Sequence, residues 1–186
     1  ITGVTTIAAG SGNNITLDHT SNNFQAAVII TSGNNVTLVD AGAIDLGAST
    51  VSGTFGVTAT AGGDITDSGV LAITGGATFT VADGRSIILD QSSTYSSTVT
   101  FVASSGTIAA VTINDSNAFD LKALTTTGNL TVTAGGAFTN SGALVIPGIA
   151  TISASGQDVT LDDSSNDFGT LAITGANVAV IDTNAI

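Results

Sequence analysis

Three aspartates stand close together near the C-terminal end of the chain, and their carboxylates are the first groups that suggest a ligand site. Asp162, Asp163 and Asp167 are separated only by two serines and an asparagine. Carboxylate and hydroxyl oxygens are hard ligands that suit Ca²⁺. The spacing is not that of an EF-hand loop, and the glycine-rich calcium-binding nonapeptide is absent. The segment is therefore a weak candidate for a calcium site, acids solvated in a turn are the favoured interpretation, and no other cofactor is predicted.

Residues with catalytic potential are scarce. His19 is the single histidine, and no G-x-S-x-G nucleophile motif accompanies it. Asp64 and Asp67 could form a carboxylate pair, because glycosidases use two carboxyl groups about 5–9.5 Å apart. A later copy of the same segment carries Ala137 and Asn140 at these positions, so the pair is not retained within the chain. We therefore predict no catalytic residues and no enzyme activity.

Composition and charge exclude several classes of function. The chain has 186 residues, a formal net charge of −12, only 9% charged residues and no cysteine. Its two basic residues, Arg85 and Lys122, cannot build the positive surface that nucleic-acid binding requires. No apolar run approaches the roughly 18 residues of a membrane-spanning helix. Without cysteine, the chain has neither disulfides nor thiolate metal sites.

The hydrophobic pattern is that of short β-strands. Apolar residues alternate with threonine, serine or aspartate in short runs that are bounded by glycine or asparagine. Several good helix formers are scarce or missing, since glutamate and methionine are absent and lysine and arginine together number 2. The chain is therefore predicted to be all-β.

An internal repeat decides among the all-β folds. The segment Ile1–Asp18 returns as Ile73–Asp90 and again as Ile146–Asp162, which gives a period of about 72 residues. Coil-length repetition of short strands favours a parallel β-solenoid over a sandwich or a propeller. In a solenoid, successive coils stack about 4.8 Å apart and alternate side chains fill the interior.

This period predicts one β-solenoid segment over residues 1–186, with superrepeats 1–72, 73–145 and an incomplete 146–186. Each superrepeat is interpreted as three coils of roughly 24 residues, so that the whole chain forms about eight coils. The alternation also predicts which side chains point inward. The inward set is Ile15, Leu17, Val36, Leu38, Ile87, Leu89, Val159 and Leu161. Ile88, which stands between two of them, is predicted to face outward or into a second contact, and an outward Ile88 would mark a contact with a neighbouring chain or strand.

Polar residues are expected to stack between coils as well. The asparagine pairs Asn13–Asn14, Asn22–Asn23 and Asn34–Asn35 are predicted to be turn or ladder residues that hydrogen-bond along the stack. Two sets of aspartates recur once per superrepeat, and three coils would separate their charges by about 14 Å, beyond the Debye length of about 8 Å. These sets are Asp18, Asp90 and Asp162, and Asp40, Asp115 and Asp182.

The repeats resemble the shafts of giant bacterial surface proteins. The segments Gly128–Ile146, Asp158–Ile186 and Ile15–Phe24 carry a resemblance to filamentous-haemagglutinin-like adhesins and related autotransporter-type exoproteins. This resemblance covers essentially the whole chain, and it implies a right-handed parallel β-helix and an exported protein. It identifies no receptor, because binding residues of such proteins usually lie outside the repeats.

The expected function is therefore mechanical: the structural shaft of an extracellular bacterial adhesin or cell-surface fibre. The alternatives are a β-helical protein that binds or degrades polysaccharides, and a self-assembling subunit of a sheath or filament. The expected partners are neighbouring coils of the same or identical chains, joined end to end through open strand edges, and host or cell-surface glycans. The expected location is extracellular, on the bacterial cell surface.

Overall fold

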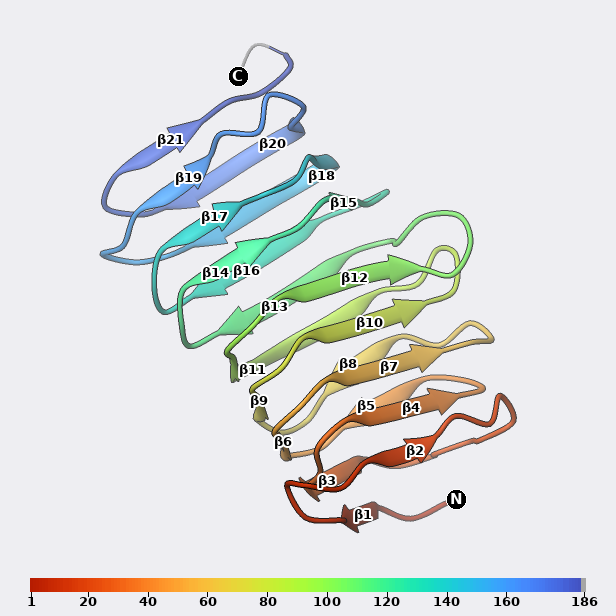
Figure 1. Ribbon diagram of the computed structural model, residues 1–186. Coiled ribbons are helices and arrows are strands. Elements are labelled where there is room, and N and C mark those ends of the chain that lie inside the picture. Colours follow the sequence, from red (N-terminus) through yellow and green to blue (C-terminus); the bar gives the residue numbers. More distant parts are fainter. Residues whose placement is uncertain (185–186) are drawn as a thin grey trace.

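The chain forms a β-solenoid in which two parallel sheets face each other across one core (Figure 1). The computed structural model describes residues 1–184, and within these residues every element is a strand. Consequently no helix in this range is long and apolar enough to cross a membrane. The all-β solenoid predicted from the sequence is confirmed.

The nine-stranded sheet, here called the front sheet, lies nearer the viewer in Figure 1. It consists of β2 (Ile15–Leu17), β4 (Val36–Asp40), β7 (Phe55–Ala59), β10 (Ala77–Val81), β12 (Val99–Ala103), β14 (Phe119–Leu121), β17 (Phe138–Asn140), β19 (Val159–Leu161) and β21 (Val178–Val180).

The twelve-stranded sheet, here called the back sheet, lies behind it. Its main path contains β1 (Thr5–Ala8), β3 (Val28–Ser32), β5 (Ile44–Leu46), β8 (Ile65–Asp67), β11 (Ile87–Tyr95), β13 (Val111–Asp115), β16 (Leu130–Ala134) and β18 (Leu144–Ser153). Four further strands pair at its sides: β6 (Ser49–Val51), β9 (Leu71–Ile73), β15 (Leu124–Thr125) and β20 (Asp167–Thr174).

The described strands pair in parallel, and the winding is right-handed. In Figure 1 the front strands run from left to right, the back strands return from right to left, and the chain climbs from the N-terminal to the C-terminal label. This is the handedness that twisted strands impose on parallel crossover connections.

The coils are shorter than predicted. In the front sheet Ile15 pairs with Val36, Val36 with Phe55, and Phe55 with Ala77. Each coil thus returns to the same position of the sheet sooner than the predicted coil of roughly 24 residues would allow. That prediction is therefore wrong, because it assumed that the superrepeat holds a whole number of coils.

The superrepeat in fact spans about three and a half coils. Ile15 lies in front strand β2, whereas its counterpart in the second superrepeat, Ile87, lies in back strand β11. Val159, the counterpart in the third superrepeat, lies in front strand β19. The interpretation of the superrepeat as three coils is thus corrected: equivalent segments occupy opposite sheets. Both sheets need the same inward–outward alternation, so the same sequence fits either.

Two junctions produce this half-coil shift. In most coils one longer strand is followed by two short strands, as in β4, β5 and β6. At the first junction, between β3 and β4, two longer strands follow each other directly across the sheets. At the second junction the same happens between β12 and β13. Each junction moves the longer strand of the coil to the opposite sheet.

The interior is apolar over the full length of the stack, as the alternation predicts. All eight predicted inward residues are buried except Leu17, which is half-buried. Leu17 belongs to β2, whose one described strand partner is β4. Ile88 is 36% exposed and points outward, as predicted.

Asn14 and Asn35, which precede front strands, cap the coil above them and confirm the ladder role, whereas Asn13 and Asn22 bond carbonyls of their own turns. Asn14 Oδ1 accepts the backbone N–H of Asn35 at 3.1 Å. Asn35 Oδ1 in turn accepts the backbone N–H of Thr54 at 3.0 Å. These bonds satisfy backbone donors at the turns, where the ladder itself ends.

Candidate functional site

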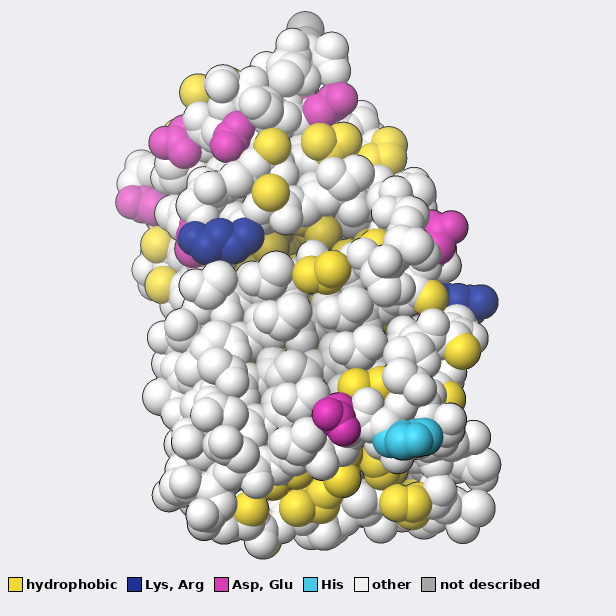
Figure 2. Space-filling model, turned by 45° about the vertical axis from the view of Figure 1, so that its right-hand side comes forward, with side chains coloured by type: hydrophobic (Ala, Val, Ile, Leu, Met, Phe, Trp, Pro, Cys, Tyr) yellow, Lys and Arg dark blue, Asp and Glu magenta, His cyan; other side chains and the backbone are white. Residues whose placement is uncertain are grey.

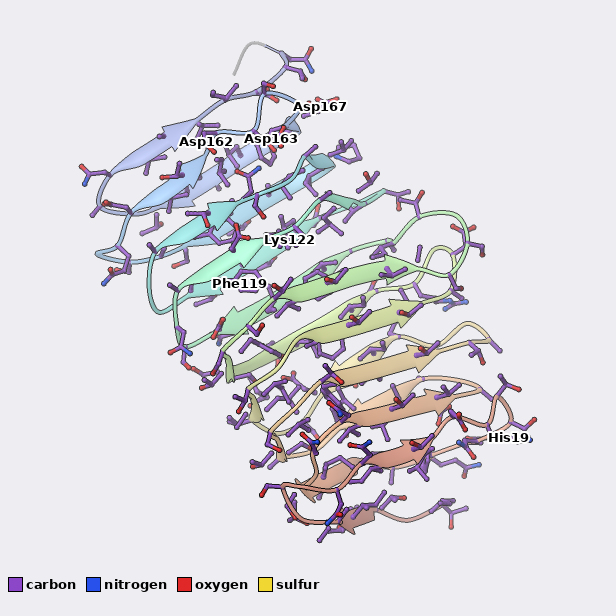
Figure 3. All side chains as sticks on the ribbon, in the orientation of Figure 1. His19, Phe119, Lys122, Asp162, Asp163 and Asp167 are labelled. Carbon is purple, nitrogen blue, oxygen red and sulfur yellow. The ribbon has the colours of Figure 1, made fainter. Side chains whose placement is uncertain are left out.

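The candidate calcium loop is held together by its own hydrogen bonds. Asp163 Oδ1 accepts the backbone N–H of Ser165 at 2.8 Å, and the Asp163 carbonyl accepts that of Asn166 at 3.2 Å. Asp167 Oδ1 accepts a bond from the Asn184 side chain at 2.9 Å. Asp162 directly follows β19 and Asp167 begins β20, and Figure 3 labels the two side chains at separate points. Within residues 1–184 no group of three or more metal-binding side chains converges on one point, and calcium binding remains a prediction.

The residues considered for catalysis are also dispersed. His19 lies exposed after β2, where its Nδ1 accepts the backbone N–H of Ser21 at 3.1 Å. Asp64 Oδ1 accepts the backbone N–H of Ser86 at 2.8 Å and so acts as a ladder cap. Asp67 instead points into the interior. The two carboxylates thus serve separate structural positions.

The sequence interpretation missed a recurring interior contact between an aspartate and an aromatic residue. Asp40 is fully buried, and its Oδ2 accepts the backbone N–H of Phe24 at 2.7 Å. Asp115 Oδ1 accepts the backbone N–H of Tyr95 at 3.3 Å, and Asp182 Oδ1 that of Phe168 at 3.2 Å. Each bond joins an aspartate to an earlier coil.

This geometry corrects the predicted charge columns. Asp40 lies in front strand β4 and Asp115 in back strand β13, so they do not belong to one column. Likewise Asp90 lies in back strand β11, whereas Asp18 and Asp162 follow front strands β2 and β19. Strand parity was the available signal: Val36, Leu38 and Asp40 alternate, so the aspartate must point inward with them.

A second interior group lies near the second junction and consists of Asp67 in β8, Tyr95 in β11 and Asp115 in β13. Burial raises the pKa of Asp67 to about 6. Hydrogen bonds from the backbone N–H groups of Gln91 and Asp90 to its Oδ1 act in the opposite direction, but burial has the larger effect. Burial also raises the pKa of Asp115. The pKa of Tyr95 is raised by burial and by the nearby charge of Asp67. Within the described residues, Asp67 Oδ2, Tyr95 Oη and Asp115 Oδ2 are buried without a hydrogen-bond partner.

The repeat offers an uncharged version of this group. Asn140 occupies the position equivalent to Asp67, and its Nδ2 donates to Asn166 Oδ1 at 2.8 Å and to the Gly142 carbonyl at 3.0 Å. An amide thus occupies the equivalent position, and we expect the fold to accept one at residue 67.

Replacing Asp67 with asparagine is expected to raise the free energy of unfolding at pH 7–8 by on the order of 1–2 kcal/mol. The folded-state pKa of about 6 lies above the ordinary value of 3.8. The stability that this carboxyl contributes is therefore fully present below pH 3.8 and is lost as the pH rises through about 6. Urea unfolding of both proteins from pH 4 to pH 8 measures the difference. Stability curves that stay parallel over this range would contradict the prediction.

The surface carries one ion pair within residues 1–184. Lys122 Nζ donates to Asp120 Oδ2 at 2.9 Å, and Lys122 also donates to Ser141 Oγ at 2.7 Å. Burial alone would raise the pKa of Asp120, but bonds from Ser141, Lys122 and Thr139 hold it below its usual value. Both charged side chains are substantially exposed, so the pair contributes little stability.

The outer surface of the described coils offers shallow hollows and no aromatic platform. A hollow of about 330 Å³ on the front sheet surrounds Gly56 and is lined largely by threonines, including Thr37, Thr78 and Thr100. Sugar-binding surfaces typically stack aromatic rings against the ligand, but all seven phenylalanines and the tyrosine are buried here.

Comparison with known proteins agrees with the repeat architecture. The profile of a family described as "Repeats of unknown function (DUF5649)" matches residues 1–31, 33–107 and 108–185. The second and third matches begin at the two junctions, between β3 and β4 and between β12 and β13. No curated protein and no solved structure matches the chain. Because the matches cover nearly its whole length, the chain belongs to the DUF5649 family of repeats.

Proposed function

We propose that this chain is a structural segment of an extracellular fibre or adhesin shaft on a bacterial cell surface. One observation carries the proposal: in the described residues, the parallel ladders stack from β2 to β21 with no inserted domain between coils. Such a stack resists extension, since backbone hydrogen bonds join each coil to its neighbours. The polar interior contacts are equally structural, as Asp40 and Asp115 bond to backbone N–H groups of earlier coils.

A whole-coil deletion in the parent protein tests this role. Phe55 and Ala77 are register partners, so removing residues 55–76 lets β4 meet β10 in the original register. We expect the shortened parent to fold, to reach the cell surface and to keep its binding activity. Each coil adds only about 4.8 Å of length, so the loss of one coil changes the reach slightly.

A half-coil deletion is the matched control. Removing residues 55–64 deletes front strand β7 but leaves its return strand β8 intact, so the following segments meet strands of the wrong sheet. We expect this variant to lose the solenoid fold, as measured by circular dichroism and thermal unfolding. If the whole-coil deletion instead kept the fold but abolished binding or glycan cleavage by the parent, the deleted coil would hold a site and the shaft proposal would fail.

Antibody labelling tests the proposed location, and light scattering with a glycan array tests the proposed partners. Antibodies raised against residues 1–186 are expected to label intact, unpermeabilised cells, and labelling only after permeabilisation would contradict a surface location. The proposed partners are identical coils joined end to end, with glycans as the second class. Light scattering is expected to show association that grows with concentration, whereas a monomer at all concentrations together with a blank glycan array would contradict both partner classes.

A further inference from the structure

The second junction leaves part of a front strand without a neighbour. On its lower side, β12 pairs with β10 along its whole length. On its upper side, β12 pairs with β14 only through Val99 and Leu121. Among the described strands, Thr100–Ala103 therefore have no partner on that side, and Figure 1 shows β12 and β14 diverging there. This segment is called the open edge.

The open edge presents backbone hydrogen-bonding groups in strand geometry. Lower in the front sheet, the N–H of inward-facing Ala77 donates to the Thr98 carbonyl of the next coil. The carbonyl of inward-facing Val81 accepts the N–H of Ser104. Inward residues thus carry the N–H and C=O groups that face the following coil. In the open edge these residues are Phe101 and Ala103.

A hollow of about 260 Å³ lies against the open edge. Phe101, Ile108 and Leu124 supply apolar contacts in it, and Val102, Thr107 and Thr125 also line it. Figure 2 shows hydrophobic side chains at the bottom of a groove that crosses the middle of the molecule. The hollow therefore combines unpaired backbone groups with an apolar floor.

The first junction contains the same position in closed form. Val28 pairs with Leu46 there, as Val99 pairs with Leu121 at the second junction. Two residues beyond Val28, the N–H of Ile30 donates to Ser49 Oγ at 2.9 Å. The Ser49 hydroxyl thus accepts the Ile30 N–H, which a longer neighbouring strand would otherwise have bonded.

The second junction lacks this closure. Phe101 corresponds to Ile30, since each lies two residues after the last paired residue. Leu124 corresponds to Ser49, since each lies three residues after the partner of that residue. A leucine side chain cannot accept a hydrogen bond. The first junction is thus closed by the Ser49 hydroxyl and, further along, by the bridge between Gly33 and Val51, whereas at the second junction leucine replaces the serine.

We propose that this hollow is a binding site for an extended peptide segment, which adds a short parallel or antiparallel strand beside Thr100–Ala103. The open edge would supply main-chain hydrogen bonds, as in β-strand addition, and the apolar floor would receive one small or β-branched side chain. Extended peptide is the occupant that fits, because the edge continues the front-sheet ladder that is intact below β12. This inference goes beyond the proposed shaft role, and it does not depend on that role.

The test uses the full chain and the peptide acetyl-KTVTVK-amide, followed by amide signals in NMR. In the free protein, the amides of Phe101 and Ala103 are expected to exchange with solvent at least about tenfold faster than those of Phe79 and Val81. Added peptide is expected to slow their exchange and to shift the resonances of residues around the hollow.

The control is the same peptide N-methylated at alternate residues, which keeps the side chains but cannot donate the edge hydrogen bonds. We expect it to bind at least about tenfold more weakly. Equal binding of both peptides, or exchange at Phe101 and Ala103 that the peptide leaves unchanged, would overturn the proposal. Protection that rises with protein concentration in the absence of peptide would show a second copy as the occupant and would equally overturn it.

A variant of the protein provides an independent check. Leu124→Ser places a hydroxyl where Ser49 closes the first junction, and it is expected to slow exchange at Phe101 and to reduce peptide binding. Val70→Ser is the control variant, because Val70 is exposed and lies far from the second junction in the sequence. If Leu124→Ser unfolds, the N-methylated peptide on the unaltered protein still decides the question. Unchanged peptide affinity in a folded Leu124→Ser variant would count against the site.

Discussion

Phe79→Ala is expected to lower the free energy of unfolding by about 3–5 kcal/mol, the range for removing a buried aromatic side chain. Phe79 is completely buried in front strand β10. Its ring lies edge-to-face with Phe55 at a centroid distance of 6.0 Å and with Tyr95 at 6.3 Å, and it stacks on Phe101 at 6.1 Å. The substitution therefore empties the centre of an aromatic cluster that spans three coils.

Thr78→Ala is the matched control, because Thr78 is the exposed neighbour in the same strand. It is expected to change stability by no more than about 0.5 kcal/mol. Urea unfolding gives the overall loss, and hydrogen exchange locates it. In a stack where each coil contacts only its neighbours, the coils of Phe55 and Phe101 should open first. A loss below about 1 kcal/mol would show that the coils collapse around the cavity.

The sequence predicts the solenoid and its inward residues because both follow from alternation. Val36 and Leu38 alternate with outward residues, and one slip of register would expose both of them. The coil length could not be predicted from alternation, because Ile15 and Ile87 match in sequence but lie in opposite sheets. Alternation determines which face of a strand is buried, but not on which side of the core that strand lies.

The buried aspartates show a different reason for a missed feature. Composition places aspartate on the surface, whereas strand parity places Asp40 inside with Val36 and Leu38. Parity prevails because the Asp40 carboxylate accepts two backbone N–H groups, that of Gly42 in the turn after β4 and that of Phe24 in the earlier coil. The need for an acceptor arises between coils, so it becomes visible only once the stacking register is known.

The open edge could not be predicted at all from the sequence. Ser49 and Leu124 are ordinary residues in short strands. Their difference matters because Ser49 accepts the N–H of Ile30 where β3 has lost its partner strand, whereas Leu124 only lines the hollow beside Phe101. Both junctions are set by pairing between distant segments, and local sequence patterns do not report such pairing.

The stacked turns make a second strong prediction: Gly63→Ala is expected to destabilise the protein by about 3 kcal/mol, the upper end of the range for forced overpacking. Gly63 lies in the turn between β7 and β8, and a Cβ there would overlap the backbone of Gly42 and Ala43 in the coil below. That backbone cannot move aside, since Ala41 and Ile44 are themselves bonded into the ladders.

Gly56→Ala separates this steric effect from the general effect of replacing glycine. Gly56 lies in front strand β7, where the nearest atom to a new Cβ is the Val36 carbonyl oxygen at 3.9 Å. Here alanine is expected to stabilise the protein by about 0.5–1 kcal/mol, because glycine loses more conformational entropy on folding. Thermal and urea unfolding of the two variants should therefore shift in opposite directions. Two shifts of the same sign would mean that the stacking distance between neighbouring coils adapts to side chains in the turns, which a rigid shaft could not allow.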